Sequence, residues 1–200
     1  MKIIKLIWNW LWLPVTLVML TFGLVSYIAK PTTVSGPSML PNLNNREHVW
    51  ALMTIPLHRG SVIVFDANGV DPTLTTKKLY VKRIIGKPGD IVTCKNGQIN
   101  VNGRPIKQNY IKNPKNTNNE SWSFKSLSKT NNWKKNRNSI YVPKNKYFVL
   151  GDNRNISNDS RFFGFVPRRK ILGVIKVFWW TQKSNKQQKD NINKQWKHFW

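Results

Sequence analysis

Cysteine and histidine are scarce in this chain of 200 residues, and their scarcity excludes several kinds of site. The single cysteine, Cys94, cannot form an internal disulfide, and one thiol cannot build a cysteine-based metal cluster. The three histidines, His48, His58 and His198, lack the spacing of metal ligands, and nothing around them recommends one for a Ser-His-Asp triad. We interpret them as surface or packing residues and Cys94 as a packed strand residue, so no metal or organic cofactor is expected.

Acidic residues are also few, with eight against 33 lysines and arginines, which gives a net charge of +25. A balance this basic indicates either an anionic partner, such as nucleic acid or a lipid surface, or a general bias in composition. The charge is spread along the chain, asparagine is abundant, and no regularly spaced basic helix stands out. We favour a general bias in composition over an anionic partner, because net charge governs solubility and non-specific binding rather than fold.

Charged residues are absent from the 24 residues between Leu6 and Ala29. A helix of that length spans roughly 36 Å, against about 30 Å of hydrocarbon in a bilayer. The run is too long for the apolar region of a typical cleaved signal peptide, and no small-x-small cleavage pattern precedes Ala29. Lys2 and Lys5 precede it and only Lys30 follows closely. We predict that residues 1–30 form a single-pass anchor in the cytoplasmic membrane, with the N-terminus in the cytoplasm and the rest of the chain on the outer side.

Helical periodicity is missing after the anchor, where short segments rich in β-branched and aromatic residues alternate with turn formers. This pattern predicts a mostly β, antiparallel domain over residues 31–180. The strands are expected at 49–53, 61–65, 78–85, 91–94, 98–101, 147–150 and 173–179.

Two segments are unusually polar. Residues 107–138 are predicted to be an inserted loop or small subdomain of weak order. Residues 181–200 form a basic tail, for which binding to an anionic membrane surface and disorder are equally compatible with the sequence.

Three glycine-punctuated segments are candidates for chemistry. In residues 35–41, Ser38 lies between Pro37 and Pro41, which stiffen the backbone around its hydroxyl. On its own, this segment fits a turn serine as well as it fits a nucleophile.

The second segment, residues 80–90, places Lys82 inside an apolar strand, with Tyr80 and Ile84 on the same face. Such a lysine either extends to solvent or is buried, in which case burial lowers its pKa. A fall of about 3 units would leave it neutral enough to take a proton from a serine. The next residue, Arg83, points to the other face, and we interpret it as a solvated strand charge.

The third segment, residues 151–164, holds Asp152 and Asp159 together with Arg154 and Arg161. This concentration of opposite charges indicates a loop fixed by hydrogen bonds. Ser157 in the same loop could orient Lys82.

Together, these segments resemble bacterial signal peptidase I. The resemblance runs from the anchor to about Val177 and rests on five pieces in the same order: SGPSMLP (35–41), RGSVIVF (59–65), YVKRIIGKPGD (80–90), VNG (101–103) and GDNRNISNDSRFFG (151–164). It implies a β-rich catalytic domain and a membrane-bound serine endopeptidase that cleaves N-terminal signal peptides from exported preproteins.

The resemblance also implies residue roles. The serine and lysine of the family's Ser-Lys dyad fall on Ser38 and Lys82, its lysine-orienting serine on Ser157, and its structural salt bridge on Asp159 and Arg161. Gly36 stands where some members carry a serine that helps to bind the oxyanion, and Asn155 and Ser61 replace common acidic residues. The implied partners are signal-peptide-bearing preproteins, the lipid bilayer and the secretion translocon, with no specific nucleic acid.

Two other functions remain open from the sequence. One is a specialised relative that matures pilin or conjugation proteins, which would have a narrow substrate context. The other is a non-enzymatic, membrane-tethered basic domain that binds nucleic acid, for which aromatic and basic residues should interleave on one face.

Overall fold

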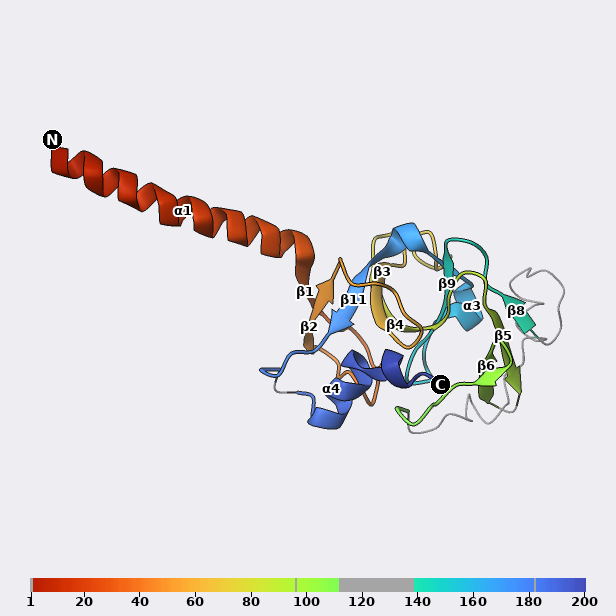
Figure 1. Cartoon of the computed structure of the whole chain (residues 1–200). Coiled ribbons are helices and arrows are strands. Elements are labelled where there is room, and N and C mark those ends of the chain that lie inside the picture. The colour runs from red at the N-terminus through yellow and green to blue at the C-terminus, as the bar shows by residue number, and fades with distance from the viewer. Residues whose placement is uncertain (1, 96, 112–138, 182) are drawn as a thin grey trace.

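A long N-terminal helix leads into a β-rich body in the computed structural model, which describes residues 2–95, 97–111, 139–181 and 183–200 (Figure 1). The helix α1 (Lys2–Ile28) projects away from the body and continues directly into β1 (Ala29–Thr33). The apolar side chains described on α1, from Trp10 to Tyr27, are exposed.

A helix is present where the membrane anchor was predicted, but it does not qualify as a membrane-spanning helix on its described residues. Where side chains are described, no helix reaches the length and hydropathy required to cross a membrane.

The described residues of the body form two sheets, and both are antiparallel, as the strand pattern predicted. The larger has seven strands in the order β1, β2 (His48–Leu52), β11 (Ile171–Lys176), β3 (Val62–Asp66), β4 (Leu79–Gly86), β9 (Lys146–Leu150) and β10 (Val166–Pro167). The smaller has the order β7 (Arg104–Pro105), β6 (Gln98–Val101), β5 (Ile91–Lys95) and β8 (Ser139–Tyr141). All seven expected strands are present with shifts of a few residues at their ends.

The strand β4 lies between β3 and β9 near the middle of the larger sheet, and it carries the candidate lysine. Its residues from Val81 to Gly86 are all buried, because core clusters cover both faces of the strand. A polar side chain on either face of β4 therefore lies in the protein interior.

The helical elements of the body are short. Those in the described ranges are α3 (Ser160–Phe163), η1 (Arg168–Lys170), α4 (Lys186–Asn193) and η2 (Gln195–His198). Most of the expected polar insert, residues 112–138, lies outside the described part of the chain.

Of the two alternatives left open for the C-terminal tail, disorder is wrong for its described residues, because α4 and η2 pack against the body. Ile192 and Phe199 are buried in two different core clusters. The side chain of Asn185 caps the first turn of α4, and Gln188 bonds back to Asn185. Since α4 buries only Ile192, its sequence shows almost no hydrophobic period, and the cap was its main local signal.

Candidate active site

Ser38 lies on a tight turn that follows β1. The Leu40 N–H donates to the Pro37 carbonyl at 3.2 Å, and the Asn42 and Leu43 N–H groups both donate to the Met39 carbonyl at 3.0 Å. Met39 and Leu43 are fully buried, so the turn is pinned to the core while Ser38 stays half-buried at its start. A serine hydroxyl is thereby held in place without being closed off from solvent.

Lys82 reaches Ser38 from the middle of β4. Its Nζ donates to Ser38 Oγ at 2.8 Å, across 44 residues of sequence. Only 4% of Lys82 is exposed, so it does not extend to solvent. The ring of Tyr80, on the same face of the strand, has its centroid 5.2 Å from Nζ. The two residues singled out separately in the sequence are therefore in direct contact.

Burial lowers the pKa of Lys82 from 10.5 to about 8. The carboxylates of Asp159 and Asp152 act in the opposite direction, and the guanidinium of Arg161 adds slightly to the decrease. With a pKa near 8, about a tenth of the lysine is neutral at pH 7, far more than for an ordinary lysine. A neutral amine at 2.8 Å from a hydroxyl is placed to accept its proton.

The loop that follows β9 is fixed by an internal ion pair. Arg161 Nε donates to Asp159 Oδ1 at 2.8 Å, and Arg161 Nη2 donates to the Arg154 carbonyl at 2.8 Å. The other carboxylate oxygen of Asp159 accepts the Gly151 N–H at 3.0 Å. All of these groups are buried, so the loop is rigid where it meets the candidate dyad.

Ser157 is brought to the dyad but is not hydrogen-bonded to Lys82. Its Oγ is buried and has no hydrogen-bond partner among the described residues. A Cβ added to Gly151 would lie 2.1 Å from Ser157 Oγ and 2.6 Å from the Ser38 carbonyl oxygen. Gly151 therefore allows the Ser157 loop and the Ser38 turn to pack closely, and no larger residue fits there.

Gly36 supplies no side chain near the dyad, and its N–H is already engaged. It donates to Asn45 Oδ1 at 3.0 Å. The φ of Gly36 is +86°, a conformation that L side chains rarely adopt.

The interpretation of Arg83 as a solvated charge is wrong. Its side chain is fully buried and makes a two-pronged pair with Asp152, from Nε to Oδ1 at 2.7 Å and from Nη2 to Oδ2 at 2.6 Å. The ring of Tyr110 lies 4.2 Å from the guanidinium carbon. Two main-chain carbonyls, of Gly60 and Asn191, accept from Nη1. The Arg83 guanidinium can be buried because the Asp152 carboxylate balances its charge and hydrogen-bond acceptors face its N–H groups.

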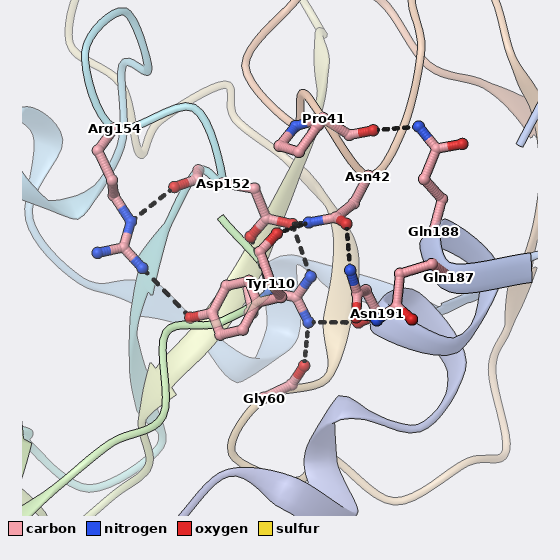
Figure 2. Close-up of polar contacts among 11 residues, drawn as sticks. Pro41, Asn42, Gly60, Tyr110, Asp152, Arg154, Gln187, Gln188 and Asn191 are labelled. Atoms are coloured by element: carbon pink, nitrogen blue, oxygen red, sulfur yellow. Dashed lines mark hydrogen bonds and ion pairs between the residues drawn. The ribbon is translucent and has the colours of Figure 1, made fainter. Parts of the chain in front are cut away.

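Of the polar residues around this pair, Asn42 and Tyr110 were not identified from the sequence (Figure 2). Asn42 donates to Asp152 and to the Tyr110 carbonyl, and Arg154 donates to Gln108, to the Tyr110 hydroxyl and to the Gly151 carbonyl. Apart from the local bond between Arg154 and Gly151, these contacts join segments more than 40 residues apart in the sequence. No local pattern signals them, although Asn42 does follow the Ser38 segment directly.

Cys94 and His58 occupy packing positions, whereas His48 and His198 are exposed at the surface. Cys94 is a free thiol on β5, and burial raises its pKa to about 11. The imidazole of His58 stacks on Trp196 at 4.7 Å between ring centroids. Within the described ranges, no cluster of three or more histidine, cysteine or acidic residues is placed to hold a metal ion.

Comparison with known proteins assigns the family. Residues 7–180 match the family described as "Signal peptidase, peptidase S26", and residues 181–200 lie beyond this match. The chain is 34% identical to signal peptidase I S of Bacillus subtilis over 192 residues, covering 94% of this chain and 95% of the relative. It is 37% identical to signal peptidase IB of Staphylococcus aureus over 163 residues, covering 77% and 79%.

A solved structure is also similar. Signal peptidase I from Enterococcus faecalis V583 matches with 30% identity and a TM-score of 0.45, over 61% of this chain and 97% of that one. The family match over most of the chain, together with the Bacillus and Staphylococcus relatives, shows that the chain belongs to the signal peptidase I family, the serine peptidases S26, and cleaves signal peptides from preproteins.

Proposed function

We propose that Ser38 is the nucleophile of this signal peptidase and that Lys82 is its general base. The observation that carries the proposal is the 2.8 Å contact between Lys82 Nζ and Ser38 Oγ, made by a lysine that is almost completely buried. Among the described residues, no carboxylate pairs with Lys82 at salt-bridge distance, so its amine is not held in the charged form by a direct partner.

The reaction follows from this geometry. Neutral Lys82 takes the proton from Ser38 Oγ as the oxygen attacks the carbonyl carbon of the residue that ends the signal peptide. The oxyanion that forms is stabilised by the Ser38 N–H, and the Lys82 ammonium returns its proton to the leaving amine. Lys82 then activates a water molecule that hydrolyses the ester on Ser38. The substrate preference expected for this site is for small residues at the first and third positions before the cleaved bond.

The loop 151–164 supports the dyad in this proposal. The Asn153 N–H donates to the Ser38 carbonyl at 3.0 Å, and the Asp159–Arg161 pair fixes the same loop from the other side. Ser157 lies against this junction, and its buried hydroxyl has no hydrogen-bond partner in the part of the chain that the structure describes. Its proposed role is to donate to the Lys82 amine once that amine has lost a proton.

A preprotein-processing assay with Ser38→Ala and Lys82→Ala tests the dyad. We expect each change to lower kcat by about 10³-fold or more, since each removes a group that takes part in bond making. Ser35→Ala and Lys77→Ala are matched controls, because both residues are exposed and lie close in sequence to the dyad residues. Cleavage at the parental rate by either dyad variant would remove that residue from the mechanism.

We also propose that α1 crosses the cytoplasmic membrane and that the β domain lies on its outer side. The family is membrane-associated, and the uncharged run from Leu6 to Ala29 is long enough to span the hydrocarbon. The Met53 N–H donates to the Ile28 carbonyl at 2.9 Å, so α1 is joined to the sheet without a linker and Ser38 stays close to the bilayer. Protease added outside intact spheroplasts should digest the β domain, and full protection of that domain would refute this orientation.

A further inference from the structure

The C-terminal helix α4 contacts the turn that carries Ser38. Gln188 Nε2 donates to the Pro41 carbonyl at 2.5 Å, and Asn191 Nδ2 donates to Asn42 Oδ1 at 2.8 Å (Figure 2). Ser184, just before the helix, donates to the buried carboxylate of Glu47. The end of the chain is therefore bonded to the segment that begins at the nucleophile.

Asn42 depends on Asn191 for its third hydrogen bond. Asn42 is completely buried, and its amide nitrogen donates to the Tyr110 carbonyl at 2.7 Å and to Asp152 Oδ2 at 2.8 Å. Both amide protons are thus in use, and the amide cannot be flipped without losing them. Its oxygen faces Asn191 Nδ2. The orientation of the Asn42 side chain is fixed at three points, one of which comes from α4.

Asn42 in turn is connected to Ser38 by two routes. Along the turn, the Asn42 N–H donates to the carbonyl of Met39, the residue after Ser38. Across the site, Asn42 bonds Asp152, and the following residue, Asn153, donates its N–H to the Ser38 carbonyl at 3.0 Å. A shift of Asn42 therefore moves both attachments of the nucleophile.

The main chain of Asn191 also bonds the buried arginine beside Lys82. Arg83 Nη1 donates to the Asn191 carbonyl at 2.9 Å. That carbonyl belongs to the last turn of α4, where carbonyl groups lack partners within the helix and carry partial negative charge. The end of α4 thus completes the hydrogen bonding of a guanidinium on the same strand as the candidate base.

We propose that Asn191 is a positioning residue for signal-peptide cleavage, holding the Ser38 turn through Asn42 and the strand of Lys82 through Arg83. The proposal rests on the assignment of Ser38 and Lys82 as the dyad. Residues 184–193 then act as an intramolecular brace, which belongs to the catalytic unit although it lies far from Ser38 in sequence.

The test is steady-state kinetics on a preprotein with Asn191→Ala in the full-length enzyme. We expect kcat to fall about tenfold or more while KM stays within about twofold, since a small displacement of reacting groups costs rate rather than binding. Asn191→Asp is the second variant, because it keeps the size of the side chain but replaces the donor that faces Asn42 Oδ1.

The matched control is Asn193→Ala, on the same helix. Among the described residues, the Asn193 side chain bonds only the main chain of Val177, at 3.0 Å and 2.7 Å, so its loss loosens α4 without touching the Ser38 turn. Asn193→Ala should lower the melting temperature as Asn191→Ala does and keep kcat within about twofold. An unchanged kcat in both Asn191 variants, or an equal loss of kcat in Asn193→Ala, would overturn the proposal.

A double-mutant cycle tests whether Asn191 affects kcat through Asn42. If Asn191 acts through Asn42, Asn191→Ala should change kcat little in an Asn42→Ala background, whereas a full additional loss contradicts this coupling. Ser38→Ala is measured alongside. An active Ser38→Ala enzyme would refute the dyad, while an inactive Ser38→Ala with a fully active Asn191→Ala would refute the brace alone.

Discussion

Lys82 and Arg83 are neighbours on β4, yet burial has opposite consequences for their charges. Arg83 is surrounded by a carboxylate, two carbonyls and an aromatic ring, so it stays charged in the interior. Lys82 contacts a serine hydroxyl and a tyrosine ring, and its pKa falls to about 8. Because their partners differ, Arg83 has a structural role, whereas Lys82 can accept and release a proton.

The burial of Lys82 destabilises the folded protein at neutral pH. Because its pKa is lower in the folded state than the ordinary 10.5, the unfolded chain binds more protons between about pH 8 and 10.5. The free energy of unfolding therefore rises with pH across that window, and below pH 8 the full penalty of about 3 kcal/mol applies.

Lys82→Met should consequently stabilise the protein while abolishing cleavage. We expect the free energy of unfolding at pH 7 to rise by about 1–3 kcal/mol, with a smaller gain at pH 10. Urea unfolding in detergent at both pH values measures it, with the exposed Lys77→Met as the neutral control. A Lys82→Met protein less stable than the parent at pH 7 would contradict the account.

At the scale of residues, strand alternation correctly placed Lys82 beside Tyr80 and opposite Arg83. It did not show that both faces of β4 are covered, because that depends on core clusters built from distant segments. Local sequence patterns also could not pair Ser38 with Lys82, because the two residues lie 44 positions apart. That pairing was expected from the family resemblance alone.

At the scale of elements, β4 is joined to the loop after β9 by the Arg83–Asp152 pair. Arg83→Leu leaves Asp152 buried without its cation, and we expect the free energy of unfolding to fall by about 3–5 kcal/mol. The control is Arg59→Leu, whose partly exposed side chain pairs with Asp90, and its cost should be nearer 1 kcal/mol. Thermal or urea unfolding of the two variants checks this order, and equal losses would refute it.

The longer strands were predictable because each carries a run of β-branched or aromatic residues between turn formers. The short strands β1, β7, β8 and β10 were not, since two to five residues without an apolar pattern form strands only when a neighbour supplies the hydrogen bonds. The helix α4 was missed for a related reason. It is stabilised by the Asn185 cap and by polar contacts to the body rather than by an apolar face.

At the scale of the whole molecule, α1 and the β body are separable parts. In the described part of the chain, the core clusters contain only residues from Val34 onward. The described side chains of α1 from Trp10 to Tyr27 are exposed rather than packed on the body. The basic net charge of +25 is carried mostly by the body and does not determine this arrangement.

Removal of residues 1–28 should therefore leave a folded body that no longer floats with lipid vesicles. We expect the melting temperature to stay within about 4 °C of the full chain, which corresponds to a change of about 1–2 kcal/mol at most for a domain of this size. Differential scanning calorimetry and vesicle flotation provide the two readouts. Loss of cooperative unfolding in the shortened chain would show that α1 is part of the core.

The central claim is that a neutral Lys82 acts as the base for Ser38, and the pH dependence of kcat/KM on a preprotein tests it most directly. That quantity reports the ionisation of the free enzyme. The account predicts a rate that is low in acid and rises with the loss of one proton at an apparent pKa near 8. A flat profile between pH 6 and 10, or a rise only near the ordinary lysine value of 10.5, would contradict it.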